Sequence, residues 1–253
     1  MTPFAVSVRK EWLEHWRNYR FLVLVVVLTL FGLLAPFTAK YGPEMMKLLP
    51  NGEAIARMMP PPTADDAVVQ YLKSVSQFGV ILALLLTMGV VAQEKDKGTA
   101  AMMLVKPLPR RSFILSKFVV LTLLFATGIG VAGLAAWYYT WLLFGAIDPA
   151  RWLALNLLVL GFVLVQVAVT LLFSVVAKSQ AAAGGMAFGV LMLLAIVSSF
   201  PVVGTYLPAQ LLGWGAALMT GNPATAWPAL AISGAIVLAS LFGAVALFEG
   251  QEV

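Results

Sequence analysis

One stretch of the chain decides its class, because no charged residue occurs from Ser179 to Phe248, a run of 70 positions. A helix needs only about 20 apolar residues to cross a bilayer, so this run exceeds a single crossing. The whole chain is similar, with 61% hydrophobic and 11% charged residues and a mean hydropathy of +0.95. Soluble domains are close to half apolar and a quarter charged. The sequence therefore predicts an integral membrane protein.

Six apolar segments are suited to cross the membrane as helices. They lie at about 21–39, 74–93, 112–137, 152–177, 181–200 and 228–248. We therefore expect an all-α integral membrane protein with one transmembrane domain over residues 1–253. Thr63, Asp65 and Asp66 predict a short helix that leads into the second span, and Ser112 is expected to cap the third.

Two further segments are expected to be helical without crossing. Residues 208–222 are apolar but too short, which predicts a re-entrant or interfacial helix that must pack on protein. Residues 4–19 predict an amphipathic helix in the membrane interface, where tryptophan is favoured, although a plain leader helix is the alternative. The aromatic and apolar positions at helical spacing are Val8, Trp12, Trp16 and Tyr19. His15 is expected to be a polar residue on that helix.

The basic residues predict the orientation. The two termini, the loop 94–117 and Lys178 carry 11 of the 16 lysines and arginines. By the positive-inside rule this side is cytoplasmic, which places both termini in the cytoplasm. The net charge of +5 is thereby explained by topology, and no nucleic-acid partner is expected.

The chain offers little catalytic chemistry. It has no cysteine and no glycine-rich phosphate loop, so we expect no ATP hydrolysis by this chain and no catalytic residue. Lys117 is counted with the preceding loop, and the spans are then expected to lack the charges that mark ion pathways. The pairs Met45-Met46 and Met58-Met59 favour adaptable packing over Cu(I) ligation, and no metal site is predicted.

The longest charged island lies between two apolar runs, at residues 93–112. Gly98 can end one helix in a left-handed conformation, and the hydroxyl of Thr99 can cap the next. Pro107 and Pro109 then stop it, because proline lacks the N–H group that a helix needs. The pattern predicts a short helix at about 99–106, outside the bilayer. An ordinary basic loop that serves only orientation is the alternative.

The residues of this island resemble those of the permease subunits of type-2 ABC exporters. The pattern is Glu94-x-Asp96-x-Gly98-Thr99, followed by Leu104, Pro107, Arg110 or Arg111, and Lys117. The resemblance implies a membrane-spanning subunit of an exporter in the inner (plasma) membrane. Two such subunits, identical or related, would join two ATPase subunits. This chain would bind no cofactor, and ATP and Mg²⁺ would be held by the partner.

The resemblance also implies roles for residues. The short helix at 99–106 would be the coupling helix, and spans 2 and 5 would line the subunit interface and pathway. The expected ATPase-coupling residues are Glu94, Asp96, Gly98, Thr99, Met102, Met103, Leu104, Pro107, Arg110, Arg111 and Lys117. Gly128 in span 3 and Gly185 and Gly189 in span 5 are expected to allow close helix contacts.

Other functions stay open at this point. A membrane subunit that anchors or assembles a partner without transport is one, such as the permease that assists maturation of a copper enzyme. A channel is less favoured, because a hydrated pore needs a polar lining or a charged ring.

Overall fold

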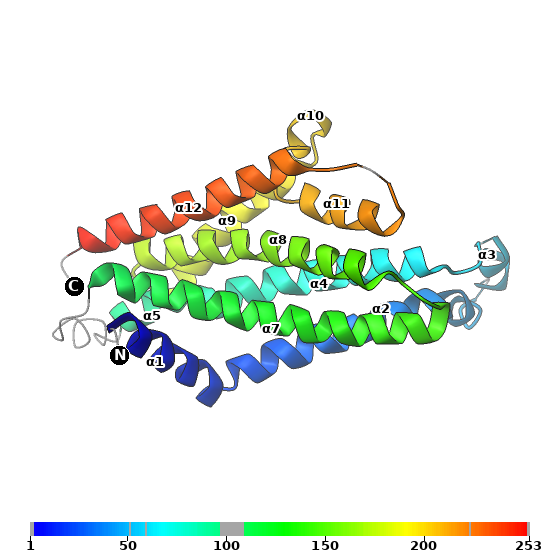
Figure 1. Ribbon diagram of the computed structural model, residues 1–253, viewed down its shortest axis with the longest axis horizontal. Helices are drawn as coiled ribbons and strands as arrows, with labels where there is room; N and C mark the ends of the chain where they lie inside the picture. Colours follow the sequence, from blue (N-terminus) through cyan, green and yellow to red (C-terminus); the bar gives the residue numbers. More distant parts are fainter. Residues whose placement is uncertain (1–2, 51, 59, 97–108, 223, 252–253) are drawn as a thin grey trace.

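The computed structural model describes residues 3–50, 52–58, 60–96, 109–222 and 224–251. Every regular element in these ranges is a helix (Figure 1). Six of them are long and apolar enough to cross a membrane. They are α2 (Arg20–Met46), α4 (Ala64–Thr87) with its continuation α5 (Ala92–Asp96), α7 (Arg110–Phe144), α8 (Pro149–Val176), α9 (Gln180–Ser198) and α12 (Trp227–Glu249). The protein is thus an all-α integral membrane protein, as its composition predicts.

Shorter helices flank the long ones. They are α1 (Pro3–Arg17), α3 (Gly52–Met58), α10 (Pro201–Gly204) and α11 (Gln210–Met219). Helix α11 lies within the apolar stretch predicted to be a short helix, and it packs on α8. Leu211 and Trp214 are its buried anchors, and the Trp214 ring lies 5.1 Å from the ring of Trp227. The predicted coupling helix at 99–106 lies outside the described residues.

The helix starts differ from the predicted ones for local reasons. Asp66 N donates to Thr63 Oγ1 at 3.4 Å, and Thr63 N donates to Asp66 Oδ2 at 2.8 Å. This reciprocal cap starts α4 at Ala64, so the predicted short helix is the first part of the span itself. Helix α7 begins directly after Pro109, and the prediction that Ser112 caps it is wrong.

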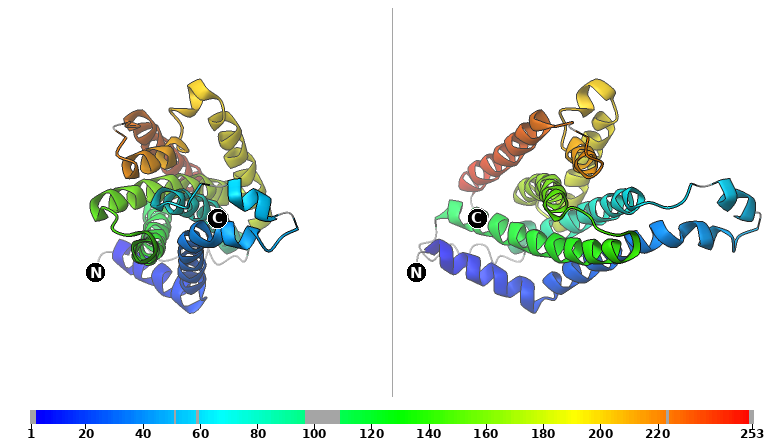
Figure 2. Two further views of the ribbon diagram at one scale, coloured as in Figure 1. Left: turned by 90° about the vertical axis from the view of Figure 1, so that its right-hand side faces the viewer. Right: turned by 45° about the vertical axis from the view of Figure 1, so that its right-hand side comes forward.

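The first span is longer than predicted. Helix α2 continues through Pro36 and Pro43 to Met46, although proline removes a hydrogen bond from a helix interior. Pro36 is buried, so packing against the neighbouring helices supports the helix at this point. The end of α2, α3 and the start of α4 extend beyond the other helices (Figure 2).

Helix α8 is the centre of the bundle. It contacts α4, α7, α9, α11 and α12, and 67% of the residues in its most apolar stretch are buried. The corresponding fractions are only 22% in α9 and 17% in α12. The last spans therefore leave most of their apolar surface to lipid or to another chain.

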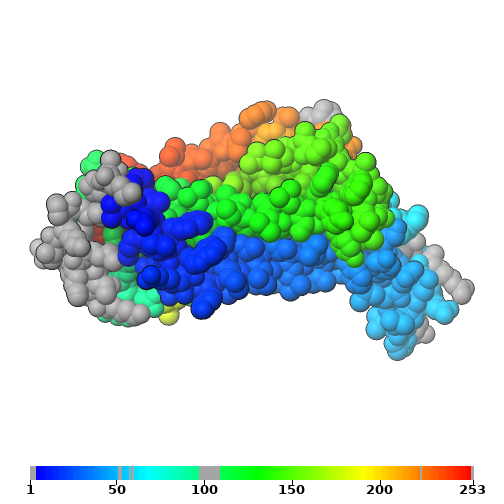
Figure 3. Space-filling model, turned by 60° about the horizontal axis from the view of Figure 1, so that its bottom comes forward, coloured from blue at the N-terminus to red at the C-terminus, as the bar shows by residue number. Residues whose placement is uncertain are grey.

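Helices α2 and α7 approach closely where glycine replaces a side chain. A Cβ on Gly128 would lie 2.8 Å from Leu24 Cδ2, and one on Gly32 would lie 3.0 Å from the carbonyl oxygen of Ala132. Gly128 thus lies at a close helix contact within the chain. Helices α1 and α2 run beside α7 on the surface in Figure 3. Between α1 and α2 the chain turns at Tyr19, which has a left-handed φ of 56°.

Candidate partner-coupling site

A cluster of buried charges joins three helices at the end of the bundle where both termini lie (Figure 1). Lys117, near the start of α7, is only 1% exposed. Its Nζ donates to Glu11 Oε1 of α1 at 3.0 Å and to Glu94 Oε1 of α5 at 2.9 Å. It also lies 4.7 Å from the ring centroid of Phe113. One cation thus fixes α1, α5 and α7 relative to one another.

Lys10 of α1, which is half-buried, also belongs to the cluster. Its Nζ lies 3.0 Å from Glu11, 3.3 Å from Glu14 and 3.4 Å from Glu94. Burial opposes the charge of Lys10, but the carboxylates of Glu11 and Glu94 outweigh it and raise the pKa of Lys10. Burial likewise disfavours the charged Glu11, and Lys117 and Lys10 outweigh it, so the pKa of Glu11 is lowered.

The face of α1 that packs on the bundle carries polar residues. Ser7, Glu11 and His15 recur every four residues and are buried, whereas Trp16 is 58% exposed and Tyr19 is 69% exposed. His15 is a polar residue of this helix, as expected, and the structure adds that it is buried, with only 3% exposed. The reason is that charges supplied by α5 and α7 make a polar face compatible with burial.

His15 borders a small polar hollow of about 20 Å³, together with Arg20, Gln93 and Lys117. Among the residues that the structure describes, its Nδ1 has no hydrogen-bond partner. Burial, followed by the nearby Arg20, lowers the pKa of His15 to about 4. His15 is therefore neutral at physiological pH.

The acidic residues of this cluster are not assigned to a metal. The carboxylate oxygens of Glu11, Glu14 and Glu94 lie within 4.8 Å of one another. Lys10 and Lys117 are already paired with them, so a cation would have to displace bound ammonium groups.

The second span is interrupted just before the charged island. Helix α4 ends at Thr87 and α5 begins at Ala92, although the sequence predicts one continuous span to residue 93. Ser174 of α8 supports the break: its Oγ accepts from Val91 N at 3.0 Å and from Ala92 N at 3.1 Å. It also donates to the carbonyl of Met88 at 2.9 Å. The freed backbone groups are thus satisfied inside the protein.

The two arginines at the start of α7 bind the end of α12. Arg110 Nη1 donates to the carbonyl oxygens of Phe248, Glu249 and Gln251 at 3.1, 2.9 and 2.7 Å. A cation suits a helix C-terminus, where carbonyl groups lack intrahelical partners. Arg111 Nε lies 2.8 Å from Glu249 Oε1 in an exposed ion pair.

Lys95 of α5 also reaches this corner. Its Nζ donates to the carbonyl oxygen of Val175 and to Gln251 Oε1. Residues on both sides of the 97–108 segment are therefore bound to the same end of the bundle.

The structure gathers some of the predicted coupling residues and separates others. Glu94 and Lys117 form one ion pair, whereas Arg110 and Arg111 lie at the end of α12. Asp96 is exposed at the end of α5. The remaining ones lie outside the described residues: Gly98, Thr99, Met102, Met103, Leu104 and Pro107.

Lys117, counted above with the preceding loop, lies within α7 and is buried. Its position beyond the start of an apolar run was a signal that it needs a buried partner. Sequence reasoning also missed Lys10, Glu11 and Ser174. The four-residue spacing from Ser7 to His15 could have indicated the buried face of α1, whereas nothing local marks Ser174.

The other predicted glycines lie in open space. A Cβ added to Gly185 or Gly189 would meet no atom within 4 Å. On another side of α9, a hollow of about 200 Å³ opens between α4, α8 and α9. Its lining includes Val80, Gln166 and Met192. Spans 2 and 5 thus border a mostly apolar space, and span 5 also exposes the small residues Gly185 and Gly189.

Comparison with known proteins identifies the family of the chain. The model of a protein family described as "ABC-2 family transporter protein" matches residues 5–213. A relative from Bacillus subtilis (strain 168), "Uncharacterized transmembrane protein YxlG", is 30% identical over 219 residues, which cover 83% of each chain. The match to the family model, over residues 5–213, includes the charged cluster at the terminus end and all the spans except the last. The chain belongs to the ABC-2 family of transporter proteins.

Proposed function

We propose that the chain is the membrane-spanning subunit of an ABC exporter and couples to a separate ATPase subunit through residues 94–111. Membership of the family supports a transmembrane transporter subunit that is not itself catalytic. ATP and Mg²⁺ would then be held by the partner, and this chain would bind no cofactor.

The observation that carries the coupling proposal is the fixing of both flanks of the 97–108 segment. On one flank, Glu94 is bound by Lys117 and Lys95 by Gln251. On the other flank, Arg110 binds the end of α12. A force applied to this segment by a partner would therefore act on α5, α7 and α12 together, and through Lys117 on α1.

The proposed orientation places this end in the cytoplasm, in the inner (plasma) membrane. It rests on the 11 basic residues assigned to that side. Because the chain lacks cysteine, single cysteines at Pro60 and Lys97 can be labelled selectively. They should react with a membrane-impermeant reagent from opposite sides. Labelling from the same side would refute the orientation.

We also propose that two such subunits pair through α9. The exposed Gly185 and Gly189 allow another helix backbone to approach, and much of the apolar surface of α9 is uncovered. Gly185→Leu should then weaken crosslinking between subunits. The hollow between α4, α8 and α9 would lie beside the pathway.

The coupling proposal is tested with the double variant Gly98→Val and Leu104→Asp. It should prevent co-purification of the ATPase, or abolish stimulation of ATP hydrolysis in proteoliposomes, while the spans stay inserted. The matched control is Gly42→Val with Leu48→Asp at the opposite end, where Gly42 has open space and Leu48 is 87% exposed. Normal binding and normal hydrolysis in the test variant would refute the docking role. ATPase binding without any transport would favour an anchoring or assembly subunit.

A further inference from the structure

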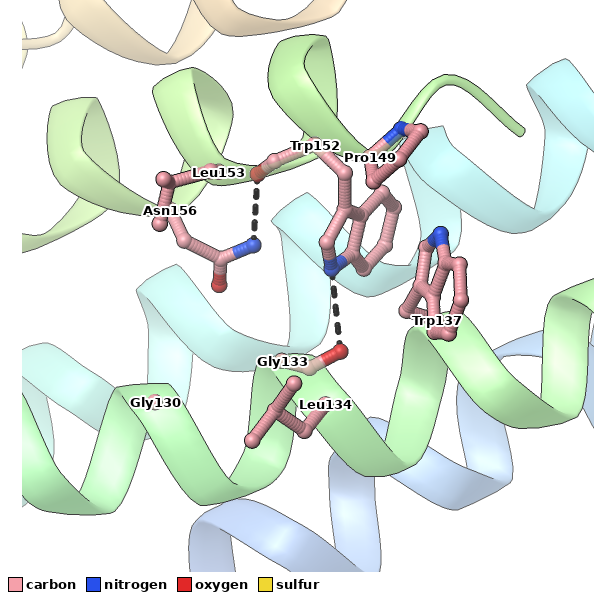
Figure 4. Close-up of a pocket in the computed structure, with 8 residues that line it drawn as sticks. All are labelled: Gly130, Gly133, Leu134, Trp137, Pro149, Trp152, Leu153 and Asn156. Carbon is pink, nitrogen blue, oxygen red and sulfur yellow. Dashed lines mark hydrogen bonds between the residues drawn. The ribbon is translucent and has the colours of Figure 1, made fainter.

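A hollow of about 390 Å³ lies between α7 and α8, in the half of the bundle remote from the termini. The residues that line it are Gly130, Gly133, Leu134, Trp137, Pro149, Trp152, Leu153 and Asn156 (Figure 4). It is separate from the charged cluster and from the hollow beside α9. Nothing in the proposed coupling depends on it.

Two glycines on α7 line the hollow, and they differ in the space that lies beside them. A Cβ on Gly130 would meet no atom within 4 Å, so the hollow is open there. A Cβ on Gly133 would lie 2.5 Å from Asn156 Oδ1, so that position is closed by the facing side chain. Gly130 is therefore the position at which the hollow can be filled without a clash.

The polar groups of the wall are bonded to protein. Trp152 Nε1 donates to the carbonyl of Gly133 at 2.9 Å, and Asn156 Nδ2 donates to the carbonyl of Trp152 at 2.9 Å (Figure 4). Tyr71 donates its hydroxyl hydrogen to Asn156 Oδ1. A water molecule needs at least two polar partners to occupy a cavity, and these groups are already engaged. The hollow therefore suits an apolar occupant.

The surroundings of the hollow indicate which occupant that is. Leu134 and Leu153 border it and are 68% and 62% exposed, although both lie on membrane-spanning helices. Exposed leucines on helices of this kind favour hydrocarbon over water as the medium outside. An apolar cavity of about 150 Å³ already accommodates benzene, so this larger hollow has room for part of a flexible hydrocarbon chain.

We propose that this hollow is a binding site for one acyl chain of a membrane phospholipid. The chain enters between Leu134 and Leu153 and packs over Gly130 against Trp137 and Trp152. It supplies the dispersion contacts that the missing side chain of Gly130 leaves unmade. In the proposed orientation the lipid belongs to the outer leaflet.

The test uses the full chain in vesicles of phosphatidylethanolamine and phosphatidylglycerol. A small fraction of the phospholipid carries a photoactivatable diazirine within one acyl chain. Peptide mapping should show labelling concentrated on residues that line the hollow, above the level on other exposed apolar residues such as Leu123 and Leu157.

Two variants close the hollow from opposite helices. Gly130→Leu fills it from α7, and Leu153→Trp narrows its mouth from α8; each should reduce labelling of Trp137 several-fold. The matched control is Gly234→Leu on α12, where a Cβ also meets nothing within 4 Å. It should leave the labelling unchanged, and folding of every variant is checked by gel filtration.

Three results would overturn the proposal. The first is labelling spread evenly over exposed apolar residues and unchanged in both variants, which indicates ordinary lipid contact. The second is labelling by a free diazirine fatty acid but not by the phospholipid, which indicates a site for a small amphiphile. The third is a crosslink between two copies of the chain at Leu134 and Leu153, which indicates that protein covers the hollow.

Discussion

The two ends of the helical bundle are held together by different physics. At the terminus end, buried Lys117 joins the carboxylates of Glu11 and Glu94. At the remote end, helices meet through aromatic packing, neutral hydrogen bonds and glycines, as between Tyr71, Trp152 and Gly133. A buried charge that loses its partner costs several kcal/mol, whereas the loss of an apolar contact leaves no unpaired charge behind. The terminus end should therefore fail abruptly on loss of one group, and the remote end should tolerate change.

The largest expected effect comes from Lys117→Met, which keeps much of the side-chain volume and removes the charge. It leaves Glu11 and Glu94 sharing only Lys10, and we expect a loss of about 4 kcal/mol in the free energy of unfolding. Thermal unfolding in detergent measures it. Arg111→Met at the same end is the control and should leave the melting temperature unchanged, because its ion pair with Glu249 is exposed.

Adding Glu11→Gln to Lys117→Met should recover part of the loss, because one uncompensated carboxylate is removed. Glu94 keeps its charge, so full recovery is not expected. If the two losses simply add, the three side chains do not act as one cluster.

The second effect is a pH dependence that belongs to the terminus end. The folded state lowers the pKa of His15 from 6.5 to about 4, so the unfolded chain takes up a proton near 6.5 and the folded chain does not. The stabilisation is fully present above pH 6.5 and is lost as pH falls towards 4. A full shift of this size corresponds to about 3 kcal/mol.

His15→Gln should flatten the dependence between pH 6.5 and 5, because the chain has no other histidine. Glu11 acts in the same direction at lower pH, since its lowered pKa makes its contribution disappear below about 4.5. The charged groups near His15 are Arg20, Glu11, Glu14 and Lys117. An unchanged slope in His15→Gln would mean that His15 is solvated and that α1 does not pack as described.

The sequence predicted the fold better than it predicted the site, for a physical reason. Lipid requires long apolar helices with satisfied backbones, and both properties are local in sequence, so the six spans follow from length and composition. The cap formed by Thr63 and Asp66 is local too, and the start of α4 could be approached from it. The break before α5 depends on Ser174, far away along the chain, which no local pattern reveals.

The site depends both on residues that are close in sequence and on contacts between distant parts of the chain. Glu94 and Lys117 were singled out from the pattern of one loop, and the structure pairs them. The contribution of α1 depends on how a helix more than 80 residues away in sequence packs on them. A row of polar residues on a helix predicts a face in contact with water unless its partners are known. Glu11 was therefore not recognised as a member of the site. The hollow beside Gly130 depends in the same way on the facing surface of α8.

The smallest expected effect belongs to the remote end. Tyr71→Phe keeps the ring beside Trp152, with centroids 4.9 Å apart, and removes only the hydroxyl that donates to Asn156. The buried Asn156 oxygen then lacks this donor, and we expect a loss of about 1.5 kcal/mol in the free energy of unfolding. Replacing the second partner as well, in Tyr71→Phe with Asn156→Leu, should recover most of it, because no polar group is left unsatisfied. Neutral pairs can thus be removed together, whereas the charge network of Lys117 leaves a carboxylate behind. A loss from Tyr71→Phe as large as that from Lys117→Met would show that the two ends do not differ in this way.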